Sequence, residues 1–174
     1  LDAGRLQTSE KILIQGGAGG VGSFAVQYAK HLGAYVITTA SAHNHDYVMA
    51  MGADEVIDYN KVDFREAVSG CDIVYDTVGL ETHRLSYDVL KSGGRMVYVS
   101  PQPQGFEVPR RDVEIIRPKV GRSREILERI VFLAASGAIK VPNIETMPLI
   151  EASAAQEKSK TGHVRGKIVL EPEH

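Results

Sequence analysis

The stretch Lys11-Ile12-Leu13-Ile14-Gln15-Gly16-Gly17-Ala18-Gly19-Gly20-Val21-Gly22 decides the fold of this chain. Its first five residues are a short apolar run, which is typical of a strand buried on both faces of a sheet. The glycines that follow predict a tight turn. Beyond them, residues 23–32 carry apolar side chains at spacings that suit a helix, and Gly33 ends it. The stretch therefore predicts a strand, a glycine-rich turn and a helix in direct succession.

Three of the glycines have the spacing Gly17-x-Gly19-x-x-Gly22, which fits the fingerprint of dinucleotide-binding proteins. The first glycine allows the tight turn, the second lets the backbone approach a pyrophosphate, and the third lets helix and strand pack closely. The helix N-terminus then offers unpaired N–H groups and the positive end of its dipole to the phosphates. Because the motif lies between a strand and a helix, we interpret it as a dinucleotide-binding loop.

Two other families use glycine-rich loops of similar form. The spacing Gly16-x-x-x-Gly20-x-Gly22 also fits short-chain dehydrogenases, and Tyr87 and Lys91 have the spacing of their catalytic Tyr-x-x-x-Lys. Lys91, however, lies at the end of a helix and just before a strand, so we interpret this second match as chance. A methyltransferase would need an acidic residue at the end of the second strand, and that position is not acidic.

Strands and helices alternate along the rest of residues 1–140. Runs of β-branched and apolar residues predict strands, and the segments between them predict helices. The expected strands are residues 35–39, 55–59, 72–76, 94–99 and 113–116, and the expected helices are residues 45–51, 62–68, 81–90 and 123–135. Asn60 is expected to cap the helix over residues 62–68. This order predicts an α/β fold with a doubly wound parallel sheet, that is, a Rossmann dinucleotide-binding domain.

Residues 141–174 form a second segment with a different pattern. Pro142 and Pro148 interrupt it, residues 150–158 suit a short helix, and residues 167–170 suit a short strand. That strand must pair within the chain, pair with another copy of the chain, or lie exposed as a sheet edge.

The end of the second strand indicates which dinucleotide is bound. An Asp or Glu at this point accepts from the ribose 2′-hydroxyl and selects NAD. Here the chain continues Ala40-Ser41-Ala42-His43-Asn44, and the first carboxylate is Asp46. A 2′-phosphate is tolerated by Ala40 with hydroxyl and imidazole donors nearby, so NADP(H) is favoured over NAD(H). His43 and His45 have no third ligand nearby, and no metal site is expected.

Composition narrows the remaining classes of function. The chain has 174 residues, a net charge of −2 and one cysteine. Neither a basic surface for nucleic acid nor an apolar run long enough for a membrane span is present in the sequence. A single cysteine excludes a disulfide within the chain, and a reducing cytoplasm is the expected compartment.

Five motifs in order resemble the medium-chain dehydrogenase/reductase superfamily, in its zinc-independent quinone oxidoreductase-like branch. They are Gly-Gly-Ala-Gly-Gly-Val-Gly (16–22), Gly-Ala-Asp-Glu-Val-Ile-Asp-Tyr (52–59), Asp-Ile-Val-Tyr-Asp-Thr-Val-Gly (72–79), Leu-Lys-Ser-Gly-Gly-Arg (90–95) and Gly-Lys-Ile-Val-Leu (166–170). The resemblance implies hydride transfer from NADPH to a quinone, enone or related carbonyl substrate. It also implies that residues 141–174 normally pack on an N-terminal GroES-like catalytic domain that this sequence does not include. The isolated chain is then expected to bind cofactor but scarcely turn over substrate, and the catalytic residues stay unknown.

The same resemblance implies the residues of the cofactor site. Gly17, Ala18, Gly19, Gly20 and Val21 would cradle the pyrophosphate. The other residues that it implies are Ser41, His43 and Tyr59 near the adenosine phosphate, Val78 and Gly79 after the fourth strand, and Ser100 and Pro101 facing the nicotinamide. Tyr59 could instead cover the sheet edge, and Ser100 could be a simple turn residue.

One alternative from another class of function stays open. The chain could be a non-catalytic nucleotide-binding module or a redox sensor, which uses NADP occupancy as a signal. Pairing of sheet edges is common in the resembling superfamily, so a homo-oligomer is the expected assembly.

Overall fold

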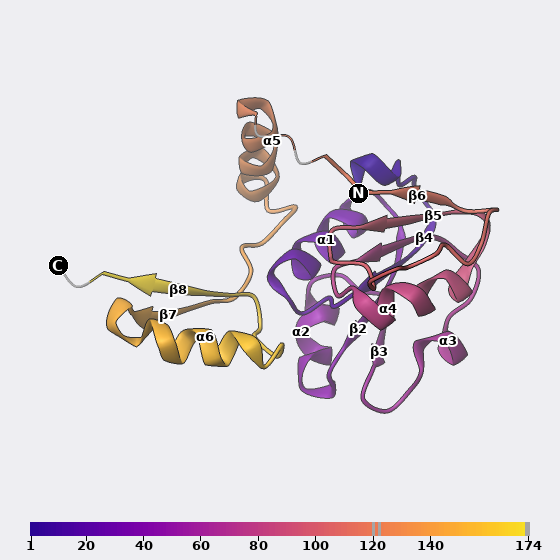
Figure 1. The fold of residues 1–174 in the computed structure, drawn as a ribbon. Coiled ribbons are helices and arrows are strands. Elements are labelled where there is room, and N and C mark those ends of the chain that lie inside the picture. Colours follow the sequence, from indigo (N-terminus) through magenta and orange to yellow (C-terminus); the bar gives the residue numbers. More distant parts are fainter. Residues whose placement is uncertain (120, 122, 173–174) are drawn as a thin grey trace.

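The computed structural model describes residues 1–119, 121 and 123–172. Its centre is a six-stranded sheet in which every neighbouring pair of strands is parallel. The strands are β1 (Lys11–Gln15), β2 (Tyr35–Ala40), β3 (Glu55–Asp58), β4 (Cys71–Asp76), β5 (Leu90–Tyr98) and β6 (Glu114–Ile116). The order β3-β2-β1-β4-β5-β6 reverses direction between β1 and β4, and this is where doubly wound sheets bind ligands. The predicted Rossmann-like α/β fold is therefore confirmed (Figure 1).

Helices cover both faces of the sheet (Figure 1). They are α1 (Gly20–His31), α2 (His45–Ala50), α3 (Phe64–Ala67) and α4 (Leu80–Leu85), with a 3-10 turn at Ser86–Val89. Successive residues of β1 point to opposite faces, so Ile12 and Ile14 pack with Val26 of α1, whereas Leu13 packs with Phe64 and Tyr87. This double burial explains why β1 is apolar at consecutive positions rather than at alternate ones.

The starts of α1 and α3 differ from the predicted ones. The first helix begins at Gly20 rather than at Ser23, so the last two glycines of the motif lie inside it. The expected Asn60 cap is wrong, because the side chain of Asp63 accepts from the N–H of Arg65 at 3.0 Å and starts the single turn α3. Asn60 instead donates its own N–H to Asp58 Oδ1 at 3.1 Å, which forms a turn at the end of β3.

The rest of the chain lies to one side of the sheet (Figure 1). It contains α5 (Arg124–Ala135), β7 (Ile144–Pro148), a 3-10 turn (Leu149–Glu151), α6 (Ala152–Lys160) and β8 (Lys167–Glu171). The strand expected over residues 167–170 pairs in parallel with β7 in a separate two-stranded sheet, so it pairs within the chain but outside the main sheet. Pro142 precedes β7 by two residues and Pro148 is its last residue, and the sequence pattern did not predict that strand.

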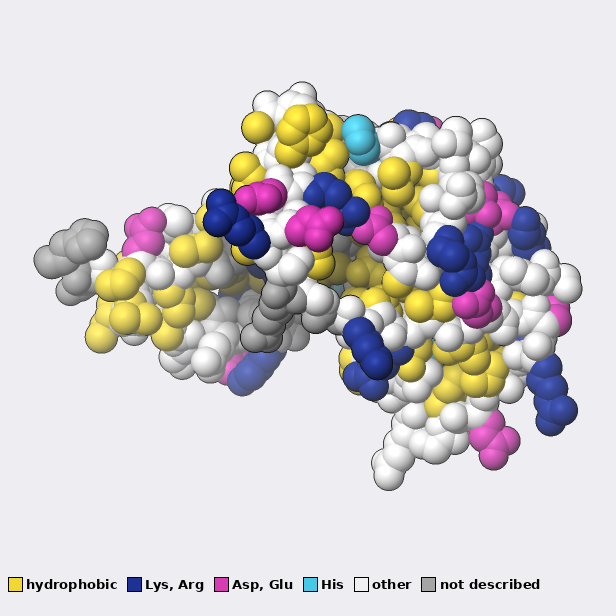
Figure 2. Space-filling model, turned by 90° about the horizontal axis from the view of Figure 1, so that it is seen from above, with side chains coloured by type: hydrophobic (Ala, Val, Ile, Leu, Met, Phe, Trp, Pro, Cys, Tyr) yellow, Lys and Arg dark blue, Asp and Glu magenta, His cyan; other side chains and the backbone are white. Residues whose placement is uncertain are grey.

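The side-chain amide of Gln27 binds the segment that connects the main sheet to the two-stranded sheet. Gln27 of α1 donates to the carbonyl of Lys140 at 3.0 Å and accepts from its N–H at 2.7 Å. The preceding helix α5 leaves Leu127, Val131 and Phe132 exposed. On the face drawn in Figure 2, acidic and basic side chains are interspersed rather than separated by sign. Within the described residues, every helix is too short or too polar to cross a membrane.

Candidate functional site

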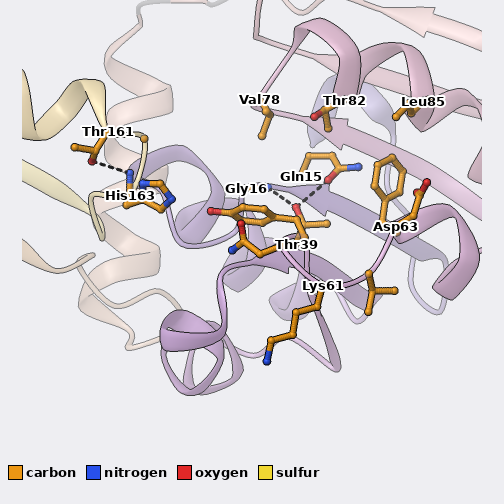
Figure 3. Close-up of a pocket in the computed structure, with 15 residues that line it drawn as sticks. Gln15, Gly16, Thr39, Lys61, Asp63, Val78, Thr82, Leu85, Thr161 and His163 are labelled. Carbon is orange, nitrogen blue, oxygen red and sulfur yellow. Dashed lines mark hydrogen bonds between the residues drawn. The ribbon is translucent and has the colours of Figure 1, made fainter.

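A cavity of about 760 Å³ lies at the carboxyl ends of β1 to β4 (Figure 3). Residues from four strand ends line it together with a loop that precedes β8. The lining residues that Figure 3 labels are Gln15, Gly16, Thr39, Lys61, Asp63, Val78, Thr82, Leu85, Thr161 and His163. A second cavity of about 300 Å³ shares Gly16, Thr39, Tyr59 and Val78 with the first and continues over Ala18, Gly19 and Ser41. Together the two cavities form one crevice at the point where the strand order reverses.

The glycine turn forms the floor of this crevice and is tied to β2. The N–H of Gly16 donates to Thr39 Oγ1 and the N–H of Gly17 to the Thr39 carbonyl, each at 3.0 Å. The turn has its positive φ at Gly16, at +77°, one residue before the glycine to which the fingerprint assigns the tight turn. Gly17 must lack a side chain for another reason, because a Cβ there would overlap the side chain of Thr38.

Gly19 is a glycine that the fold itself does not require. Its φ of −71° is open to any residue, and the nearest atom to a Cβ built there is the Gly16 carbonyl oxygen at 3.5 Å. A Cβ at Gly22, by contrast, would overlap that same oxygen, which accounts for the third glycine of the motif. Gly19 therefore leaves an empty space beside the crevice that a close-fitting ligand can use.

The N-terminus of α1 adjoins the crevice at its N-cap residue, Gly19, and is uncapped. Among the described residues, no side chain hydrogen-bonds to its first N–H groups, and no acidic residue lies in its first turn. The side chain of Lys167, from β8, lies against Gly20. Free N–H groups, a positive helix end and a lysine are the donors that a diphosphate prefers. The residues present thus fit the pyrophosphate of a dinucleotide.

Polar side chains gather after β2, where the sequence predicted recognition of the adenosine phosphate. Ser41 Oγ lies 3.0 Å from His43 Nδ1, and Asn44 Nδ2 donates to the same Oγ at 3.2 Å. A residue that the sequence analysis missed joins them: Arg165 donates to the carbonyl of His43 and to Asn44 Oδ1, both at 2.9 Å. Its guanidinium also lies over the ring of Tyr47, with 5.1 Å between Arg165 Cζ and the ring centroid.

One carboxylate does lie near the end of β2, but both of its oxygens already have partners within the chain. Asp58 is the partner of Ala40 in the β2–β3 register. Its Oδ1 accepts from the N–H of Asn60, and its Oδ2 lies 3.9 Å from Lys61 Nζ. Asp58 is buried, so it does not take the exposed position that accepts from a ribose 2′-hydroxyl in NAD-selective proteins.

Tyr59 and Val78 line both cavities and are about half exposed, at 47% and 49%. Opposite them is the loop Thr161–Val164, in which Thr161 Oγ1 accepts from the N–H of His163 at 3.2 Å. The sequence analysis missed this loop, because nothing in its composition marks it as part of a site. Gly20 and Val21, which the resemblance places at the pyrophosphate, face another cavity of about 350 Å³, between α1 and Ile130 of α5.

The remaining predicted residues lie where β4 and β5 end. Gly79 has a φ of +87°, and a Cβ there would collide with the carbonyl oxygen of Pro101. That oxygen accepts from the N–H of Leu80 at 3.0 Å, and Ser100 is buried with its hydroxyl on Asp76. The structure thus brings Gly79, Ser100 and Pro101 into contact with one another, beside the two cavities rather than on their walls.

Residues 51–170 match the protein family described as zinc-binding dehydrogenases. This match covers more than half of the chain and includes the ends of β3, β4 and β5. The chain belongs to the medium-chain dehydrogenase/reductase superfamily and is quinone oxidoreductase-like. The predicted family is therefore confirmed.

Three relatives in this superfamily illustrate the similarity. A chloroplast envelope quinone oxidoreductase homolog of Arabidopsis thaliana is 31% identical, over 92% of this chain and 52% of its own length. The quinone oxidoreductase of Coxiella burnetii has a TM-score of 0.88 at 36% identity, over 98% of this chain and 55% of its own. The Escherichia coli quinone oxidoreductase, solved in complex with NADPH, has a TM-score of 0.81 at 30% identity, over 96% and 58%. The chain thus spans about half the length of these members.

The description of the matched family implies a zinc ion. In the part of the chain that the structure describes, no three His, Cys, Asp or Glu side chains lie together as a metal site would require. The His, Cys, Asp and Glu side chains of this part of the chain therefore do not fit a zinc ion.

Proposed function

We propose that this chain binds NADP(H) and is the cofactor-binding portion of an oxidoreductase that transfers hydride from NADPH to a quinone, enone or related carbonyl substrate. The uncapped N-terminus of α1 beside the open position at Gly19 carries this proposal. It offers several donors and room for a diphosphate at the carboxyl ends of a parallel sheet. The oxidoreductases of the same superfamily, one of them solved with NADPH, support the class of reaction.

In this proposal the crevice and the loops beside it each receive a part of the cofactor. Residues 17–21 bind the pyrophosphate, and Tyr59 and Val78 flank the adenosine. Gly79, Ser100 and Pro101 lie at the nicotinamide end, because they follow the strands on the other side of β1. When bound, the cofactor supplies the hydride from C4 of its reduced ring, and the protein orients that ring and excludes water.

The preference for NADP(H) over NAD(H) rests on charge. Ser41 and His43 are donors at the end of β2, and Arg165 brings a permanent positive charge to the same point. These groups would lie close to a 2′-phosphate. The buried carboxylate of Asp58 instead accepts from the N–H of Asn60 in the turn after β3. These contacts support NADP(H) as the cofactor.

We also propose that residues 141–174 belong to the catalytic domain. Val141 and Ile150 are exposed at 68% and 84%, which supports a role for this segment in packing against further protein. A cytoplasmic location and a homo-oligomeric assembly stay predictions from the sequence.

Titration of the purified chain with NADPH and NADH, followed by nicotinamide fluorescence, tests the cofactor. We expect tighter binding of NADPH, and equal or tighter binding of NADH contradicts the preference. NADPH consumption with a quinone, compared between this chain and a chain extended upstream of Leu1, tests the reaction. Activity only in the extended chain supports the proposal, whereas NADPH binding without turnover in either chain supports a non-catalytic nucleotide-binding module.

A further inference from the structure

A fully buried acid–histidine pair lies beneath the ends of β4 and β5. Asp76, the last residue of β4, and His83, in α4, have no exposed surface, and Asp76 Oδ2 lies 2.9 Å from His83 Nδ1. Neither residue lines the crevice, and neither has a part in the proposed function. A buried charge is costly unless it is fully hydrogen-bonded, so the partners of this carboxylate explain what it stabilises.

Asp76 hydrogen-bonds to both loops at this end of the sheet. Its Oδ1 accepts from the N–H groups of Val78 and Gly79, both at 2.9 Å, and its Oδ2 accepts from the hydroxyl of Ser100 at 3.0 Å. Burial by itself raises the pKa of Asp76, but the hydrogen bonds from His83, these N–H groups and Ser100 outweigh burial and hold its pKa below the ordinary value. One ionised carboxylate thus connects the loop after β4 to the loop after β5.

His83 extends the same connection on its other side. With Nδ1 donating to Asp76, Nε2 faces Gln102 Nε2 at 3.3 Å and the Tyr87 hydroxyl at 3.4 Å. The rings of Tyr98 and Phe106 pack edge-on against the imidazole, with centroids at 4.9 and 5.2 Å. The histidine is therefore fixed in orientation by packing as well as by hydrogen bonds.

The loop that Asp76 holds is in a conformation that needs support. Gly79 and Leu80 have consecutive positive φ angles, of +87° and +51°, and Leu80 is not a glycine. A non-glycine residue is strained in this region and stays there only where its surroundings impose it. The bonds from Asp76 to the backbone just before Leu80 and from Leu80 to Pro101 supply that support.

We propose that Asp76 and His83 are positioning residues for the nicotinamide ring, because their hydrogen bonds set the relative position of loops 77–79 and 100–102. This inference rests on the proposed function, which places those loops against the nicotinamide. The pair would not touch the cofactor and would act only through Val78, Gly79 and Ser100.

The test compares two ligands, NADPH and 2′-phospho-ADP-ribose, which lacks the nicotinamide. His83→Phe keeps a ring in the packed space but removes both nitrogens. We expect it to weaken binding of NADPH roughly tenfold, as loss of a hydrogen bond to a charged group does, with binding of 2′-phospho-ADP-ribose unchanged within about twofold. His83→Asn places an N–H close to the position of Nδ1, and we expect it to restore most of the NADPH affinity. Glu81→Gln, on the exposed side of the same helix, is the control and should bind both ligands normally.

Calorimetry of both ligands separates the outcomes. If His83→Phe binds both ligands more weakly by the same factor, or binds neither more weakly, the positioning role is overturned. If His83→Phe does not fold, Ser100→Ala removes a different donor from the same carboxylate and should show the same selective loss; a non-selective result with Ser100→Ala overturns the inference equally. Failure of the unmodified chain to bind either ligand would refute the proposed function itself, and the inference with it.

Discussion

Gly166 pairs with Gly19 in a parallel β-bridge, although most of the chain separates the two residues. The N–H of Gly166 also donates to the carbonyl of Ala18 at 3.1 Å. The segment before β8 is therefore attached directly to the glycine turn, with Arg165 just before and Lys167 just after the attached residue in the sequence. Gly166 has a φ of +70°, and a Cβ there would overlap the backbone of Asn143. Only glycine fits this position without a shift of the backbone.

We expect Gly166→Ala to loosen the C-terminal segment from the crevice. The substitution adds a steric overlap to the strain of a positive φ, so it should cost more than the about 1–2 kcal/mol of strain alone. Gly137→Ala is the matched control, because Gly137 has a φ of +75° but no atom within 4 Å of a Cβ. Urea unfolding gives the two free energies, and hydrogen exchange should speed up in residues 161–171 of Gly166→Ala alone. Similar effects of the two substitutions would contradict the attachment.

We expect Gly19→Ala to abolish most cofactor binding and leave the fold intact. Its backbone angles suit alanine and its Cβ makes only an ordinary contact, at 3.5 Å, with the Gly16 carbonyl oxygen, so the free energy of unfolding should change by less than about 0.5 kcal/mol. The new methyl group would fill the room proposed for the pyrophosphate, and NADPH affinity should fall at least about tenfold. Gly17→Ala is the contrasting variant, which should destabilise the fold because its Cβ overlaps Thr38. Normal NADPH binding by a folded Gly19→Ala chain would place the pyrophosphate elsewhere.

We expect Arg165→Gln to weaken the binding of NADPH more than the binding of NADH. The substitution removes a charge near the proposed 2′-phosphate, and a charged hydrogen bond corresponds to roughly a tenfold change in affinity. NADH has no such phosphate, so its affinity should change little. Arg124→Gln, which removes a 91% exposed guanidinium from α5, is the control. Equal losses for both nucleotides would mean that Arg165 only shapes the loop at His43 and Asn44.

We expect the thiol of Cys71 to be unreactive in the folded chain. The residue is fully buried, and burial raises the pKa of its thiol to about 12. A disulfide reagent at pH 8 should therefore label it only after urea is added.

The same raised pKa predicts a pH dependence of stability. The unfolded thiol ionises from about pH 8.5, whereas the folded one stays protonated until its higher pKa is reached. The stabilising contribution is thus fully present below about pH 8.5 and is lost as the pH rises toward 12, by at most about 1.4 kcal/mol per pH unit. Cys71→Ala should lack this part of the dependence. Rapid labelling of the folded protein at pH 8 would contradict the buried thiol. Identical pH profiles of the free energy of unfolding for the unmodified chain and Cys71→Ala would contradict its effect on stability.

Local pattern was sufficient to predict the main sheet. The apolar run at β1, the glycines after it and the β-branched residues of β2 are short-range signals, and the parallel order follows from the helices between strands. The pattern failed where a choice depends on distant atoms. The fingerprint assigns the tight turn to Gly17, whereas the positive φ is at Gly16, whose N–H donates to Thr39 of the neighbouring strand.

The parts of the site that the sequence did not predict come from distant segments. Arg165 reaches the end of β2 only because β8 is attached to the glycine turn. Asp76 and His83 looked like an ordinary strand end and an ordinary helix residue, and their connection appears only when α4 packs on the sheet. The signal that could have indicated Arg165 is its place next to the Gly-Lys-Ile-Val-Leu motif, which the resemblance already singled out.

The loop Thr161–Val164 has a consequence for how the protein is made. The strands that form the rest of the crevice leave the ribosome first, and a domain of this size can begin to fold while later residues are still being synthesised. The wall that contains His163 is therefore synthesised after every strand of the main sheet. If the proposed function holds, a nucleotide captured before that moment would be held only on one side, and we expect tight binding to develop late in translation.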